Sequence, residues 1–300
     1  MLHDFLHALA LFPALSLGLV LIIGLIIGSF LNVVIHRLPK MMEREWKQQC
    51  ELLLDTAHTA TDTTTPAENT QPFNLMVPRS RCPHCGHAIT ALQNIPVISY
   101  LVLRGKCAGC KAAISPRYPI IELVTGLLSV AVVAYLGLTT AALLGLVFTW
   151  CLITLTMIDA DTQLLPDDIT LPLLWLGLIA NSFGVFTTLE NALWGAVAGY
   201  MVLWSIFWLF KLLTGKEGMG YGDFKLLAAL GAWMGWQVLP QIIILSSLVG
   251  AVVGIALMLI KKRGKEVPIP FGPYLAVAGW IAFVWGDAIN HHYLSLTLPQ

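Results

Sequence analysis

Long apolar runs, each nearly free of charged residues, recur along the sequence. They cover residues 12–35, 118–136, 140–158, 169–187, 191–212, 224–239, 240–260 and 270–287. A helix that spans a bilayer needs about 20 mostly apolar residues, so these runs predict an all-α polytopic membrane protein with about eight transmembrane helices. The composition agrees with this prediction, because only 11% of the residues are charged, whereas a soluble domain has roughly 25%.

The run over 224–239 is the weakest, because it is short, carries Asp223 and Lys225 at its start, and is parted from the next run only by Pro240. The basic residues favour counting it as a span. All 17 Lys and Arg residues fall within three regions, 36–117, 211–225 and 261–265. Eight spans put these regions on one side of the membrane, which the positive-inside rule makes the cytoplasmic side. Seven spans would separate the last two regions, so we predict eight spans and periplasmic N- and C-termini.

The apolar pattern also divides the chain into domains. No Lys or Arg precedes the first run and no small-residue cleavage site follows it, so we expect residues 1–35 to stay in the membrane as the first transmembrane helix. Residues 36–117 form a cytoplasmic domain, in which 41–76 is polar and irregular, with a flexible Thr-rich stretch at 56–72. Residues 118–300 form the transmembrane helical bundle. The sequence shows no internal repeat.

Two CxxC pairs stand in the polar domain, CPHC at 82–85 and CAGC at 107–110. Each CxxC turn points two thiolates at one metal, and Zn²⁺ accepts four thiolates in a tetrahedral site. The module at 78–117 is too small for a sufficient apolar core, so a metal would supply its folding energy. Four thiolates leave no open coordination position. We therefore predict structural zinc, rather than a redox dithiol pair, at Cys82, Cys85, Cys107 and Cys110.

Three acidic side chains lie at or within the apolar runs, where charge is costly and usually functional. Asp159 ends the third run in MIDADTQLLPDD, Asp223 precedes the sixth in GMGYGDFK, and Glu122 lies inside the second. With eight spans, Asp159 and Asp223 meet the same cytoplasmic boundary. Two carboxylates that share a site hold a proton between them, so one can act as a base on water and the other as an acid toward a scissile carbonyl.

Other interpretations of these acids stay open. Asp159 has three competitors in the same stretch, which are Asp161, Asp167 and Asp168. The last two follow Pro166 and could begin the next helix. Asp223 could be only the N-cap of its helix, and Glu122 could make a structural hydrogen bond.

Several motifs resemble those of one known family over nearly the whole chain. They are GSFLNVVIHRLP at 28–39, the two CxxC pairs, IDADTQLLPDD at 158–168, GMGYGDFK at 218–225 and PIPFGPYLA at 268–276. The family is that of the type IV prepilin peptidases, which are bifunctional leader peptidases and N-methyltransferases of the Gly-x-Gly-Asp class of intramembrane aspartyl proteases. The resemblance implies that Asp159 and Asp223 are the catalytic pair, a choice that spacing left open.

The resemblance also implies a substrate, a second reaction and a location. The substrates would be type IV prepilins and type II secretion pseudopilins, which lose a basic leader peptide at the cytoplasmic face of the bacterial inner membrane. The new N-terminal residue would then be methylated with S-adenosylmethionine. RGKC at 104–107 matches the segment implicated in methylation, so Gly105 and Lys106 are candidate residues for it.

Two other classes of function compete with this one. A polytopic transporter could use the membrane carboxylates as an ion relay, but the acids lie at one boundary rather than at mid-membrane. A membrane scaffold could recruit a cytosolic partner through the zinc module, but it would leave the acid pair without a role. A nucleic-acid partner is not expected, because the net formal charge is +0 and provides no basic footprint.

Overall fold

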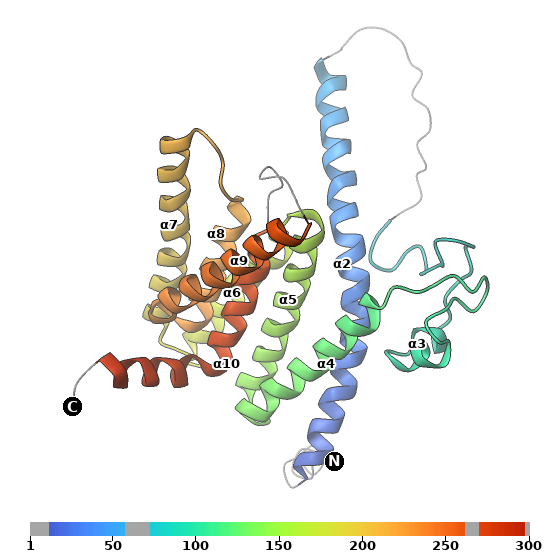
Figure 1. Cartoon of the computed structure of the whole chain (residues 1–300), viewed down its shortest axis with the longest axis horizontal. Helices are drawn as coiled ribbons and strands as arrows, with labels where there is room; N and C mark the ends of the chain where they lie inside the picture. The colour runs from blue at the N-terminus through green and yellow to red at the C-terminus, as the bar shows by residue number, and fades with distance from the viewer. Residues whose placement is uncertain (1–11, 58–72, 262–269, 298–300) are drawn as a thin grey trace. The chain divides into compact units, whose positions relative to one another are not determined.

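The computed structural model describes residues 12–57, 73–261 and 270–297, and helices make up almost all of its regular structure (Figure 1). No strand forms among these residues, which contain only two isolated β-bridges. The predicted all-α class is therefore confirmed. The chain divides into two compact units, which we name the cysteine unit, Leu21–Leu127, and the bundle unit, Met1–Val20 with Leu128–Gln300. The predicted domain boundaries at 35 and 117 stay predictions.

Within the described ranges, five helices are long and apolar enough to cross a membrane. They are α2 (Pro13–Ala57), α4 (Arg117–Leu136), α5 (Thr140–Thr162), α7 (Leu189–Thr214) and α9 (Leu239–Lys261). The other three predicted runs also contain helices, α6 (Asp167–Ser182), α8 (Tyr221–Met234) and α10 (Gly272–Thr297). The first two of these have 16 and 14 residues, fewer than the roughly 20 that a span needs. The count of eight spans therefore stays a prediction.

Helix α2 corrects the prediction that residues 41–76 are irregular. It is 45 residues long and continues to Ala57, so it extends about 68 Å, well beyond the thickness of a bilayer. Its polar half consists mainly of good helix formers such as Met, Glu, Lys, Gln and Leu. Lys47 and Glu43 form an ion pair of 2.9 Å one turn apart, which supports the helix further. Of the stretch expected to be flexible, residues 58–72 lie outside the described residues.

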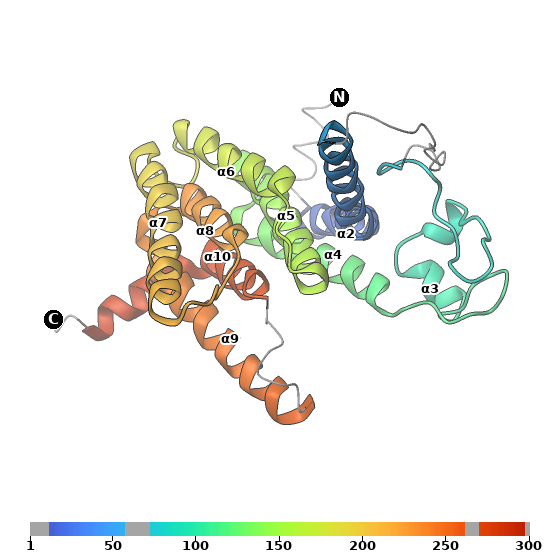
Figure 2. The ribbon, with the colours of Figure 1, turned by 90° about the horizontal axis from the view of Figure 1, so that it is seen from above.

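Helix α8, which corresponds to the weakest predicted run, is the centre of the bundle unit. It packs against α6, α7 and α10 (Figure 2), and it is buried from Asp223 to Trp233 except at Lys225. A helix that is covered all round by protein does not need the length or the hydropathy of a lipid-facing span. The run is weak because α8 is a core helix.

Small residues let α7 and α8 approach closely. A Cβ atom added at Gly195 of α7 would overlap the carbonyl oxygen of Gly231 of α8, and one added at Gly199 would lie 2.6 Å from the Leu227 carbonyl oxygen. Such contacts are typical of helix pairs in membranes, where packing replaces the hydrophobic effect. On the opposite side of α8, the indole N–H of Trp233 donates to the Leu173 carbonyl of α6 at 2.8 Å.

Candidate active site

Two short links bring Asp159 and Asp223 to the same end of the bundle unit. Helix α5 ends in a left-handed residue, Gln163, whose N–H donates to the Asp159 carbonyl at 2.9 Å, and three residues, 164–166, separate it from α6. Helix α7 also ends in a left-handed residue, Gly215, and α8 begins at Tyr221. Left-handed residues are the usual way to end a helix and turn the chain back. The C-terminus of α5 and the N-terminus of α8 therefore lie at one end of the bundle.

Asp159 and Asp223 line one cavity of about 370 Å³ at this end. Its walls come from the two links and from Pro270 and Phe271, just before α10. Both acids are buried, with exposed fractions of 5% for Asp159 and 6% for Asp223. The cavity thus holds two carboxylates that come from different helices and are shielded from bulk solvent.

Asp159 has an unpaired oxygen in this cavity. Its Oδ2 atom is buried and has no hydrogen-bond partner among the described residues. Gly272, at the start of α10, stands over it, because a Cβ atom added there would lie 2.6 Å from Oδ2. An unsatisfied buried acceptor costs about 1–3 kcal/mol, so such an atom in a cavity indicates a group that arrives from outside the fold.

Asp223 is not the N-cap of α8. That position belongs to Gly220, and Asp223 is the third residue of the helix, where its carboxylate complements the positive end of the helix dipole. A Cβ atom added at Gly222 would lie 2.7 Å from the Cβ atom of Leu165. The second glycine of the Gly-x-Gly-Asp motif therefore allows α8 to approach the α5–α6 link closely, which keeps Asp223 in the cavity.

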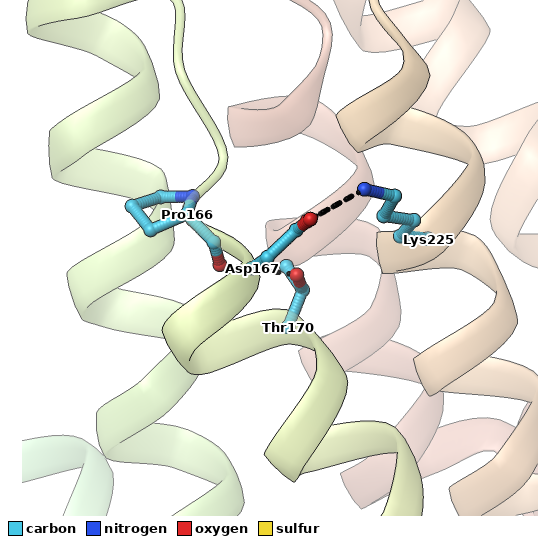
Figure 3. Close-up of polar contacts among 4 residues, drawn as sticks. All are labelled: Pro166, Asp167, Thr170 and Lys225. Carbon is cyan, nitrogen blue, oxygen red and sulfur yellow. Dashed lines mark hydrogen bonds and ion pairs between the residues drawn. The ribbon is translucent and has the colours of Figure 1, made fainter. Parts of the chain in front are cut away.

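The competing acids occupy different places. Asp161 and Asp168 are exposed, and neither lines the cavity. Asp167 lines it, but this residue forms an ion pair with Lys225 (Figure 3), in which both carboxylate oxygens lie 2.7 Å from the ammonium group. The backbone around it is set by Pro166, whose carbonyl accepts a 3.0 Å bond from the Thr170 hydroxyl (Figure 3). Burial thus separates Asp159 from the acids that spacing could not exclude.

Glu122, in the cysteine unit, makes a structural hydrogen bond. Its Oε2 atom accepts from the backbone N–H of Val97 at 2.8 Å, and the residue is only 8% exposed. Val97 has φ 57° and precedes the short helix α3 (Ile98–Val102). A β-branched residue rarely adopts a positive φ, so the buried carboxylate helps to hold this turn in place.

The four predicted metal ligands gather in one cluster. The Sγ atoms of Cys82, Cys85, Cys107 and Cys110 all lie within 4.8 Å of one another. The Cys82–Cys110 and Cys85–Cys107 sulfur distances are 3.8 and 4.0 Å. A tetrahedral site with Zn–S bonds of about 2.3 Å has edges of about 3.8 Å, so the cluster fits a metal of that size.

The cluster is built from a short internal repeat that the sequence analysis missed. RCPHCGHAI at 81–89 and KCAGCKAAI at 106–114 share cysteines, alanine and isoleucine at the same spacing. The two segments make equivalent bonds, since Cys82 N–H donates to His87 O at 2.9 Å and Cys107 N–H donates to Ala112 O at 2.8 Å. Each also forms one β-bridge, Arg81 with Ala88 and Lys106 with Ala113. A comparison of the chain with itself at a fixed offset would have revealed the pair.

Gly105 and Lys106, which the resemblance made candidates for methylation, lie beside a second cavity, of about 810 Å³, in the cysteine unit. Neither lines it, but Tyr100 does. Gly105 has φ 67°, and a Cβ atom added there would lie 2.9 Å from the Tyr100 hydroxyl oxygen. Gly105 therefore sets the position of a side chain in the cavity wall, whereas Lys106 is exposed and contributes a β-bridge.

These features define an all-α membrane protein with a carboxylate pair in one cavity and a four-thiol cluster in a small module. Two family models match the chain: Bacterial Peptidase A24 N-terminal domain over residues 22–136 and Type IV leader peptidase family over residues 146–255. Three relatives carry the name prepilin leader peptidase/N-methyltransferase. The protein of Stutzerimonas stutzeri is 60% identical over 91% of this chain and 92% of its own length. That of Aeromonas hydrophila is 58% identical over 94% and 95%, and that of Pseudomonas aeruginosa is 57% identical over 91% and 92%.

The chain belongs to the prepilin leader peptidase/N-methyltransferase family. No solved structure matches it.

Proposed function

We propose that this chain is an intramembrane aspartyl endopeptidase that removes the basic leader from type IV prepilins and pseudopilins, and then methylates the new N-terminus. One observation carries the peptidase assignment: Asp159 and Asp223, from two different helices, are buried in one cavity. The family to which the chain belongs has both activities in its name. Both acids lie at one end of the bundle, which gives no support to an ion relay across it.

In the proposed reaction the two carboxylates share one proton. The ionised carboxylate takes a proton from a water molecule, whose oxygen attacks the scissile carbonyl carbon, while the protonated carboxyl donates to the carbonyl oxygen. When the C–N bond breaks, the leaving amine takes up a proton from the pair. The substrate must be extended at the scissile bond, because a helix occupies each carbonyl in a hydrogen bond with the residue four positions later.

We place the cavity at the cytoplasmic face of the bacterial inner membrane. Lys211 and Lys225 form ion pairs with Glu217 and Asp167, which line the cavity. These two lysines thus flank the end that carries the two acids. By the positive-inside rule this end faces the cytoplasm, and the termini of the chain lie in the periplasm.

For methylation we propose S-adenosylmethionine as the donor and the larger cavity of the cysteine unit as its binding site. A volume of about 810 Å³ falls within the range of about 300–1,000 Å³ that is typical of small-molecule sites. Gly105 supports this assignment because it lies against Tyr100, a residue that lines the cavity.

We propose zinc for the thiol cluster. Cys82, Cys85, Cys107 and Cys110 would hold it, and it would supply structural cross-linking of the two repeated segments rather than chemistry.

Incubation of the purified protein with a prepilin and isotope-labelled S-adenosylmethionine tests both reactions. Mass spectrometry of the product should find a chain without its leader whose first residue carries one labelled methyl group. The Asp159→Asn variant should leave the prepilin uncut and still methylate a substrate supplied without its leader. An uncut prepilin with the wild-type protein would contradict the proposed function.

A further inference from the structure

The cavity that holds Asp159 and Asp223 has an excess of acidic groups. Among the residues that the structure describes, four carboxylates line it, those of Asp159, Asp167, Glu217 and Asp223, together with one ammonium group, that of Lys225. The two additional acids, Asp167 and Glu217, are 52% and 67% exposed at their side chains. They therefore form an acidic rim around the buried pair.

Each acid of the rim is already bound to a lysine of the same chain. The ammonium group of Lys225 pairs with Asp167 (Figure 3) and lies 2.7 Å from both of its carboxylate oxygens. The ammonium group of Lys211 lies 2.7 Å from Oε1 of Glu217. The side chains of these lysines are 29% and 35% exposed. Partly exposed ion pairs are weak, so another cation can replace either lysine at little cost.

A second observation indicates that the cavity receives a ligand. Asp159 lines it, and the Oδ2 atom of this residue is buried and without a hydrogen-bond partner in the part of the chain that the structure describes. A peptide that enters the cavity would bring polar groups to this atom and would carry its neighbouring side chains past the rim.

We propose that Asp167 and Glu217 form a subsite for lysine or arginine side chains of the substrate, which Lys225 and Lys211 occupy in the free protein. A cationic side chain near the scissile bond displaces the internal lysine and takes over its carboxylate. The subsite thereby favours substrates with basic residues beside the cleaved bond. This inference rests on the proposed peptidase function.

Two variants that break the same ion pair give opposite predictions. The measurement is kcat/KM for two peptides, one with lysines in the leader and one with glutamines in their place. Asp167→Asn removes the carboxylate, so the preference for the lysine peptide should fall about three- to tenfold, mainly through KM. Lys225→Gln removes the competing cation, so the preference for the lysine peptide should rise. If the ion pair were only structural, both variants would change the preference in the same direction or leave it unaltered, and either result would overturn the proposal.

Asp168→Asn is the matched control. It removes the same charge from the same turn of α6, but Asp168 does not line the cavity, so the preference should stay within twofold. Glu217→Gln provides an independent test at the other acid and should lower the preference as Asp167→Asn does. If Asp167→Asn fails to fold, an unaltered preference in both Glu217→Gln and Lys225→Gln overturns the proposal.

Binding separates this proposal from the peptidase assignment. In an Asp159→Asn background, fluorescence anisotropy should show that the lysine peptide binds more tightly than the glutamine peptide, and that adding salt removes most of the difference. Equal binding of both peptides would overturn the subsite even if cleavage is observed. Conversely, if the wild-type protein cuts neither peptide, the proposed function is contradicted. The binding measurement would still test the subsite in that case.

Discussion

The bundle unit and the cysteine module are stabilised in different ways. In the bundle, ten of the 14 residues of α8 are buried, and glycines bring α7 within backbone contact. Between positions 73 and 116, by contrast, Cys107 is the only buried residue. Apolar packing holds the first region, whereas the second has almost no core and depends on its thiol cluster. The two regions should therefore lose their structure in response to different perturbations.

Removal of the proposed zinc should have the largest effect, and it should affect the cysteine module and leave the bundle folded. With a chelator, or in a Cys82→Ser variant, the module should lose its fold, because three thiolates cannot hold the tetrahedral site. Limited proteolysis should then cut within residues 73–116, while circular dichroism should show that the helix content changes little. Cys50→Ser, a change at an exposed cysteine outside the cluster, is the control. The protease should cut this variant no faster than it cuts the wild type. Loss of the bundle helices on chelation would show that the two regions are not independent.

A substitution in the α7–α8 contact should destabilise the bundle and leave the cysteine module intact. In Gly195→Ala, the added Cβ atom would overlap the Gly231 carbonyl oxygen, so we expect the bundle to lose about 1–3 kcal/mol of stability. Thermal unfolding in detergent should show a lower Tm for the helices, with unchanged metal content. Leu193→Ala, on an exposed position of the same helix, should shift Tm much less. Similar effects of the two substitutions would contradict the close packing.

The smallest effect should appear within the repeat of the cysteine module. Gly86 and Lys111 hold equivalent places, with φ 69° and 62°, but only glycine adopts this conformation without cost. Lys111→Gly relieves about 1–2 kcal/mol of left-handed strain and adds about 0.4–1 kcal/mol of unfolded-chain entropy. The module with its proposed zinc should therefore gain up to about 1 kcal/mol of stability, seen as a slower loss of zinc to a competing chelator. Faster loss would mean that the two segments are not equivalent.

The sequence predicted the fold where a regularity was local. Apolar runs located the helices, and the spacing of the CxxC pairs indicated the cluster, because both depend on neighbouring residues. It failed at 41–57, where the polar composition was taken to mean irregular chain although the residues favour a helix. From hydropathy alone, α8 was predicted to be a weak transmembrane span. Hydropathy does not show whether lipid or other helices surround an apolar helix.

Within the site, the sequence could propose the acids but could not rank them. Asp159 and Asp161 are two positions apart, yet the first is buried and the second is exposed, and only the packing of α5 decides between them. The Asp167–Lys225 ion pair joins residues 58 positions apart, and no local sequence pattern predicts it. The unpaired oxygen of Asp159 likewise depends on where Gly272 and the two links lie.

The rate of leader removal by Asp159→Asn and Asp223→Asn, compared with the wild type, tests the central claim most directly. Both acids are needed for one proton transfer, so each substitution should slow cleavage by about 10³-fold or more, while the helix content and Tm stay close to those of the wild type. Cleavage at the wild-type rate by either folded variant would contradict the account, because the carboxylates of one cavity would then not perform the reaction.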